Sequence, residues 1–179
     1  MKLYHASTNH YAKGEVVGPF VQTRFFENKI VPTGHQSVEC LLEQARPETK
    51  FSRLKAVYAF AEPGQCIIYL HGEGVAQFFL YEVAMDSTTI CPMLLVDFIS
   101  RYKCSAQVTE ALTKEYWDPK MEWRLTEYLA GSLQIVAEVD KNKYTMQSYA
   151  AHLACQEDTK QASALVSSFQ ASIKEIDIP

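Results

Sequence analysis

The segment Lys2-Leu3-Tyr4-His5-Ala6-Ser7 opens the chain as a short apolar strand that carries a histidine and a hydroxyl residue to its end. A strand leading into an ordinary loop would alternate apolar and polar residues and then reach Gly or Pro. Strand ends are where the sheets of α/β and α+β proteins tend to hold ligands. We therefore expect His5 to contribute to a site, provided that other segments supply partners for it.

The composition predicts one globular domain. The chain has 179 residues, of which 47% are hydrophobic and 21% charged, with a net charge of -4. That length allows one sizeable core. The acidic balance argues against a broad electrostatic surface for nucleic acid. A small basic pocket for phosphate is still compatible with it.

The cysteines and the apolar runs predict a cytoplasmic, intracellular protein. The five cysteines show no CxxC spacing and no zinc-type cluster with histidine, which is typical of reduced thiols. No stretch resembles a signal peptide, and no apolar run is long enough to cross a membrane. We expect no metal and no membrane partner.

Hydrophobic periodicity predicts an α+β fold with a small, mostly antiparallel sheet and flanking helices. Residues 121–129 are ambiguous between helix and strand, 20–35 are irregular and 90–104 are mixed. We expect residues 1–179 to form a single domain, with 145–175 as a C-terminal helical extension packed on it. The predicted strands are 2–6, 15–17, 55–60, 75–85 and 133–139, and the predicted helices are 36–45, 62–71, 105–116 and 145–175.

Several common catalytic motifs do not occur. No GxGxxG follows a predicted strand, and the sequence contains no GxxxxGK[ST], GxSxG or HExxH. Dinucleotide-binding Rossmann, P-loop, α/β-hydrolase and zincin interpretations therefore lack their key residues.

Four segments are distinctive in their order and spacing: Leu3–Thr8, Lys13–Val17, Ser52–Phe60 and Thr126–Val136. Together they resemble the ADP-ribosyltransferase superfamily. The similarity is to its histidine–tyrosine–glutamate branch, which includes poly-ADP-ribosyl polymerases, diphtheria-type toxins and rifampicin-modifying transferases. It runs loosely over residues 2–139 and leaves the tail outside. The resemblance implies an ADP-ribosyltransferase-like fold with a split sheet.

The resemblance implies a mono-ADP-ribosyltransferase that moves ADP-ribose from NAD to an acceptor and releases nicotinamide. Members of the family pass through an oxocarbenium-like state, which a carboxylate stabilises much as in glycoside hydrolysis. By this resemblance, His5 hydrogen-bonds the adenosine-side ribose. Tyr58 stacks on the nicotinamide ring, and Glu127 is the catalytic acid. Without the resemblance, the three read as a strand-edge histidine, a core aromatic and a surface charge.

Three further residues complete the expected NAD site. The resemblance implies that the Ala6 backbone holds the nicotinamide amide and that Ser7 supports the turn. The family commonly has glycine where this chain has Ala6, which is acceptable only if the backbone there needs no positive φ. Arg53 is a candidate for the pyrophosphate, because a guanidinium matches phosphate geometry. Its position is the basis for this assignment.

Some alternatives stay open. Glu122 rivals Glu127 as the acid, although Glu127 is followed by an apolar pair, a glycine turn and an alternating strand. Leu125 stands where arginine-specific transferases carry a second acid, which disfavours an arginine acceptor. Protein, nucleic acid and small-molecule acceptors remain possible, and a bacterial or phage source suits a small modifying enzyme. The alternatives are a catalytically inactive module that binds NAD, another nucleotide or a partner, and an RNA 2′-phosphotransferase, which the sparse basic residues disfavour.

Overall fold

The structure is a computed structural model that describes residues 1–18, 38–72, 74–101 and 106–176. Seven strands form one sheet in the order β2-β7-β4-β1-β3-β6-β5, and every pair in it is antiparallel. The strands are β1 (Leu3–Ser7), β2 (Val16–Val17), β3 (Val57–Phe60), β4 (Phe79–Ala84), β5 (Thr89–Pro92), β6 (Thr126–Ala130) and β7 (Leu133–Val139).

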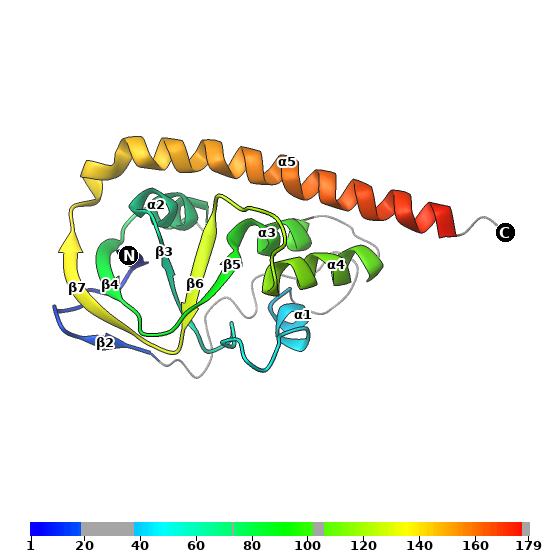
Figure 1. Ribbon diagram of the computed structural model, residues 1–179. Helices are drawn as coiled ribbons and strands as arrows, with labels where there is room; N and C mark the ends of the chain where they lie inside the picture. Colours follow the sequence, from blue (N-terminus) through cyan, green and yellow to red (C-terminus); the bar gives the residue numbers. More distant parts are fainter. Residues whose placement is uncertain (19–37, 73, 102–105, 177–179) are drawn as a thin grey trace.

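The helices lie mainly along one face and one end of this sheet (Figure 1). The longest of them, α5, contacts α2, α3 and α4. It covers the segment that the sequence predicts as a C-terminal helix. The helices are α1 (Val38–Gln44), α2 (Pro63–Gly72), α3 (Met93–Arg101), α4 (Ala106–Trp117) and α5 (Thr145–Ile176), and a 3-10 turn, η1 (Lys141–Tyr144), precedes the last of them.

The coarse fold class follows the α+β prediction, but the sheet differs in size and in its division. The predicted sheet is small and split, whereas the described strands form one hydrogen-bonded sheet of seven. The strands β2, β7, β4 and β1 form one part of the sheet, and β3, β6 and β5 form the other. The two parts meet at a narrow junction, because β1 pairs with β3 only at Tyr4↔Phe60. On its other side, β1 pairs with β4 along its whole length, from Leu3 to Ser7. A weakly joined boundary therefore runs beside β1.

Two elements differ from their predicted extents. The sequence predicts a strand over 75–85, but β4 begins only at Phe79 because Phe78 packs with Ile67 and Leu70 of α2. Residues 90–104, predicted as mixed, instead contain the end of β5 and the helix α3. The segment 20–35, predicted as irregular, lies within residues 19–37, outside the described residues.

Buried side chains occupy both faces of the sheet. One cluster lies between the sheet, α2 and α5 and includes Phe60, Leu80 and Leu125. A second lies on the opposite face and includes Val57, Tyr81 and Tyr128. The largest joins β5 and β6 to α1, α3, α4 and α5, with Trp117 at its centre donating a hydrogen bond to the Leu42 carbonyl over 2.7 Å. The site described next borders this third cluster.

Candidate functional site

A buried guanidinium lies at the centre of the candidate site. Arg53, in the turn before β3, is only 4% exposed. Its Nε and Nη2 donate to the two oxygens of Glu39 over 2.6 and 3.0 Å. Its Nη1 donates to Glu127 Oε1 and to the Tyr116 hydroxyl. The Tyr116 hydroxyl in turn donates to Glu127 Oε1 over 2.6 Å. Two carboxylates, a phenol and a guanidinium thus form one buried polar cluster.

Four different elements bring these groups together. Glu39 lies in the first turn of α1, Tyr116 in the last turn of α4, and Glu127 in β6. The pairing Cys91↔Glu127 between β5 and β6 adds a thiol on the same face. A buried charge is tolerated when it is paired and hydrogen-bonded, which Arg53 achieves with both of its acidic partners.

Tyr58 connects this cluster to β3. Its hydroxyl donates to the Arg53 carbonyl over 2.6 Å, and the centre of its ring lies 5.2 Å from the Arg53 guanidinium carbon. Phe60 pairs with Glu127, and Tyr58 is two residues from Phe60 along the strand. Because side chains alternate between faces, Tyr58 and Glu127 lie on the same face of the sheet.

His5 joins the network through the backbone of Tyr58. Its Nδ1 lies 2.7 Å from the Tyr58 carbonyl oxygen. A carbonyl oxygen only accepts, so Nδ1 must carry the proton of this bond. Since Tyr4 pairs with Phe60, strict alternation places His5 on the face opposite Tyr58 and Glu127. His5 therefore meets Tyr58 at the junction of β1 and β3, not side chain to side chain.

The turn after β1 forms without strain. Ser7 Oγ accepts the Asn9 N–H over 3.0 Å, a local bond that supports this turn. Among the described residues, positive φ occurs only at glycines, so Ala6 has an ordinary backbone conformation. The difference from the family's glycine therefore introduces no conformational problem at Ala6.

The two candidate acids occupy different environments. Glu122 is exposed and precedes β6, and its carbonyl accepts a hydrogen bond from Gln161 of α5. Glu127 is 2% exposed and lies within the buried cluster. The structure therefore brings Glu127, and not Glu122, together with Arg53, Tyr58 and, through Tyr58, His5.

The electrostatics of Glu127 are set by opposing effects. Burial raises the pKa of its carboxyl, while the Arg53 guanidinium and the Tyr116 hydrogen bond act in the opposite direction. Burial also opposes the charge on Arg53, yet Glu127 and Glu39 raise the pKa of the guanidinium well above its ordinary value. Arg53 is consequently a permanent cation in this site.

Arg53 does not occupy the environment that its predicted role requires. A pyrophosphate ligand needs a guanidinium with donors directed toward solvent or a cleft. Here Nε, Nη1 and Nη2 each bond a residue of the chain itself. Binding of pyrophosphate by Arg53 stays a prediction, and this arrangement does not support it.

A cavity of about 10 Å³ borders the cluster, which is room for one water at most. Both hydrogen bonds to Glu127 end on Oε1, and no described residue bonds its other oxygen, Oε2. One side of the carboxylate is thus fixed, and the other is without a hydrogen-bonding partner in the described part of the chain. The cavity is lined by Glu39, Arg53, Tyr69, Met93, Val96, Asp97 and Glu127.

Sequence reasoning missed Glu39 and the role of the Tyr116 hydroxyl. Glu39 lies in a predicted amphipathic helix, where a glutamate is normally solvated. Its distance along the chain from Arg53 is 14 residues, and no short motif connects them. Tyr116 reads as a core aromatic at a helix end, which its burial agrees with. The available signal was an acidic residue on the apolar side of a predicted helix.

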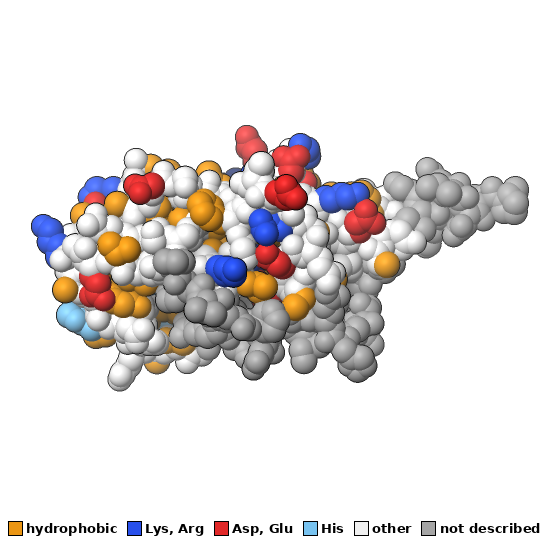
Figure 2. Space-filling view, turned by 90° about the horizontal axis from the view of Figure 1, so that it is seen from below, with side chains coloured by type: hydrophobic (Ala, Val, Ile, Leu, Met, Phe, Trp, Pro, Cys, Tyr) orange, Lys and Arg blue, Asp and Glu red, His pale blue; other side chains and the backbone are white. Residues whose placement is uncertain are grey.

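Surface features give few further indications of a ligand. On the face seen in Figure 2, acidic and basic side chains of the described residues are interspersed. The described residues contain no group of three or more His, Cys, Asp or Glu placed to hold a metal. Within the described ranges, every helix is too short or too polar to cross a bilayer.

No protein-family model matches the chain, and no curated protein matches it.

Proposed function

We propose that this chain is an NAD-dependent mono-ADP-ribosyltransferase, with Glu127 as its catalytic acid. The observation that supports this most is the continuous series of contacts from His5 through Tyr58 and Arg53 to Glu127. These residues come from segments far apart in the sequence, on or beside the adjacent strands β1, β3 and β6. The resemblance in sequence motifs anticipates the same grouping of histidine, tyrosine and glutamate.

Each side chain has a defined part in the proposed reaction. His5, whose Nδ1 donates to the Tyr58 carbonyl at the junction of β1 and β3, bonds a hydroxyl of the adenosine-side ribose. Tyr58 stacks on the nicotinamide ring, whose amide bonds the backbone of Ala6 beside the turn supported by Ser7. Glu127 stabilises the positive charge that develops on the other ribose.

The chemical step breaks the bond between the nicotinamide nitrogen and ribose C1′. The bonding electron pair leaves with nicotinamide, which becomes neutral, and C1′ becomes oxocarbenium-like. A nucleophile of the acceptor then bonds C1′ and gives up its proton to water. The ionised form of Glu127 is the one that lowers the energy of this cationic state. Oε2, which no described residue bonds, is the oxygen suited to the reacting ribose.

A second function, binding without turnover, is favoured by one observation. Glu127 is 2% exposed, and the neighbouring cavity of about 10 Å³ is far smaller than a ligand site of a few hundred Å³. In this conformation NAD cannot reach Glu127 through that cavity. A catalytically inactive module would use the same fold to hold NAD, another nucleotide or a partner.

The two functions are separated by incubating the protein with NAD labelled in its adenosine part and measuring nicotinamide release. A cell lysate supplies acceptors and is then divided into protein, nucleic-acid and small-molecule fractions. A transferase releases nicotinamide and labels one fraction, with loss of both in Glu127→Ala and a sharp decrease in His5→Ala. Glu122→Ala is the matched control and should retain activity.

The transferase proposal is overturned if the wild-type protein releases no nicotinamide in the presence of any of the acceptor classes. Saturable binding of NAD or ADP-ribose without release would then support the binding module. The fraction that becomes labelled identifies the acceptor class among protein, nucleic acid and small molecule.

A further inference from the structure

We infer that Arg53 is the positioning residue of Glu127 and that Glu39 in turn holds Arg53 in place, an inference that rests on the proposed function. Arg53 would then act on the reaction through the carboxylate instead of through a phosphate of NAD. Neither Arg53 nor Glu39 touches the substrate in this scheme.

The planar shape of the Arg53 guanidinium determines which way its free end points. Its Nε and Nη2 edge binds both oxygens of Glu39, which fixes the plane of the group. The remaining end, Nη1, then points at Glu127 Oε1. A lysine ammonium has no such fork and cannot bind two separated carboxylates in this geometry. The orientation of Glu127 therefore depends on Glu39, although no bond joins the two acids.

The hydrogen bonds to Glu127 are unevenly distributed over its two oxygens. Arg53 and Tyr116 both bond Oε1, so they hold one oxygen and the plane of the carboxylate. A purely structural ion pair would gain most by using both oxygens, as Arg53 does with Glu39. Fixing one oxygen while leaving the other unbonded by described residues is suited to presenting Oε2 to a reacting group.

The titratable groups around Glu127 determine how easily it is protonated. They are Glu39 from α1, Tyr69 from α2, Asp97 from α3, Tyr116 from α4, Cys91 from β5, and Tyr58 and Arg53 from β3 and the turn before it. Among these described groups, Arg53 is the only cation. Its removal leaves Glu127 beside other acids in a buried site, which favours the protonated carboxyl.

Arg53→Lys is the principal variant, because it keeps a positive charge and removes the fork. In nicotinamide release, we expect kcat to fall about tenfold or more while KM for NAD changes less than about twofold. The acid side of the kcat pH profile should move to higher pH, because a lysine ammonium cannot reach both Glu39 and Glu127, and a Glu127 without its hydrogen-bonded cation binds a proton more readily. Glu39→Gln should change both quantities in the same direction and by less.

Arg46→Lys is the matched control. Arg46 also pairs with a glutamate of α1, its Nε lying 2.8 Å from Glu43 Oε1, but that pair is partly exposed and outside the cluster. We expect wild-type kcat and pH profile in this variant. If Arg53→Lys also keeps the wild-type kcat and pH profile and only its melting temperature falls, Arg53 is a structural pin and the inference is overturned.

A second measurement separates this inference from the proposed function. In protein labelled with ¹³C at glutamate carboxyls, the Glu127 signal can be assigned by its loss in Glu127→Gln and followed with pH. We expect it to titrate at a higher pH in Arg53→Lys than in wild type. Coinciding titration curves would overturn the inference, even if NAD is cleaved. A shifted curve in a protein that does not cleave NAD would support the arrangement and reject only the transferase function.

Discussion

Asp158 and Glu127 are both almost fully buried, and their partners differ in kind. Asp158 of α5 is 1% exposed, and its oxygens accept the backbone N–H groups of Arg124 and Leu125 over 3.0 and 2.9 Å. Glu127, just after that segment, is 2% exposed and is held by side chains alone. One carboxylate is bound to the main chain, and the other to groups that can move or be replaced.

The difference assigns the two acids to different tasks. Backbone donors have a fixed position and no net charge, so Asp158 clamps α5 onto the segment that enters β6. Both of its oxygens are used, and it has no obvious capacity for chemistry. Glu127 instead faces a permanent cation and a phenol on one oxygen only. Burial by itself therefore does not identify a functional acid, whereas the nature of its partners does.

The largest effect on this comparison of Glu127 and Asp158 is expected from Arg53→Ala. The substitution leaves Glu39 and Glu127 buried without their cation, which should lower the free energy of unfolding by about 3–5 kcal/mol. Denaturant unfolding of the variant and wild type measures the change. The control is Arg46→Ala, whose partly exposed ion pair should contribute less than about 1 kcal/mol. Equal effects of the two substitutions would contradict the buried cluster.

The corresponding test of the other acid is Asp158→Ala. It leaves the N–H groups of Arg124 and Leu125 without their acceptors, which should cost about 2 kcal/mol of unfolding free energy. Glu157→Ala is the neighbouring control, because its ion pair with Arg124 is exposed and should contribute little. Thermal unfolding with near-ultraviolet circular dichroism measures both. A clamp that is purely structural also requires that nicotinamide release per folded molecule stays unchanged in Asp158→Ala.

Gly64→Ala sharpens the structural side of the comparison, because Gly64 lies at a second contact of α5. A Cβ atom at Gly64 would lie 2.4 Å from the Gln147 carbonyl oxygen, which is backbone and cannot turn away. We expect a loss of about 1–3 kcal/mol in unfolding free energy as α2 and α5 separate. Gly72→Ala at the other end of α2 is the control, since its Cβ meets nothing within 4 Å. A neutral Gly64→Ala would show that the two helices are less closely packed.

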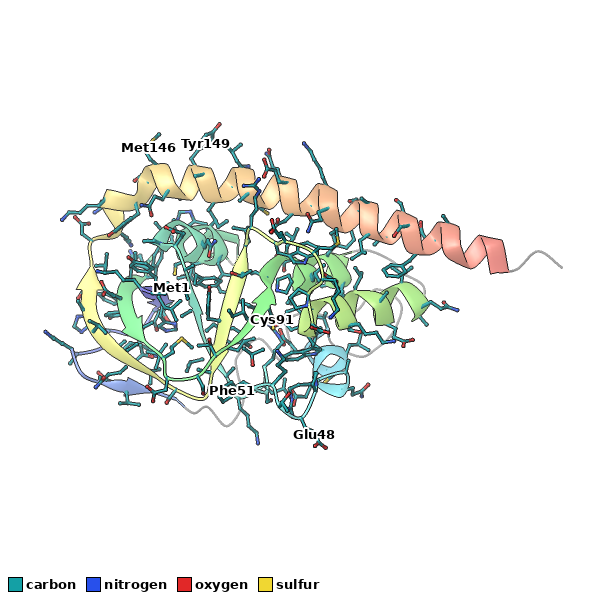
Figure 3. The ribbon with its side chains drawn as sticks, viewed as in Figure 1. Met1, Glu48, Phe51, Cys91, Met146 and Tyr149 are labelled. Carbon is teal, nitrogen blue, oxygen red and sulfur yellow. The ribbon has the colours of Figure 1, made fainter. Side chains whose placement is uncertain are left out.

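The smallest effect concerns the thiol beside Glu127. Burial raises the pKa of Cys91 to about 12, so at about pH 8 only on the order of one molecule in ten thousand carries the thiolate. Iodoacetamide should leave Cys91 intact in the folded protein while it alkylates the partly exposed Cys40 and Cys155. Mass spectrometry of peptides measures the extents, and denatured protein should react at every cysteine. Alkylation of Cys91 at the rate of Cys155 would contradict a closed cluster. Figure 3 shows Cys91 on β5, inside the domain, whereas Met146 and Tyr149 project outward from α5.

The parts of the fold with a clear period could be predicted from sequence. The alternating segment from Leu133 to Val139 has the same bounds as β7, because one face of this strand is more buried than the other. The run from Met93 to Val96 was uninformative, since a short apolar stretch suits a helix or a strand equally. Phe78 has the composition of a strand residue but packs against α2, and only tertiary structure determines that difference.

For the candidate site, several of the residues could be predicted from sequence, but the contacts between them could not. His5, Tyr58, Arg53 and Glu127 are noticeable in sequence because they lie at strand ends or in recognisable segments. That Arg53 binds two acids cannot be predicted in this manner, because Glu127 is 74 residues away from it and neither residue belongs to a shared motif. Such pairings arise from the way strands and helices assemble, and local pattern contains no information about them.

The central position of β1 has a consequence for how the chain folds. His5 and Tyr58 are 53 residues apart, and Lys2 bonds Glu82, 80 residues away. Both neighbours of β1 in the sheet, β3 and β4, thus lie far downstream in the sequence, and the loop-closure entropy must be overcome before either pairing forms. Local units such as the helix α5 can form earlier. We therefore expect the junction that holds His5 to be completed late in folding.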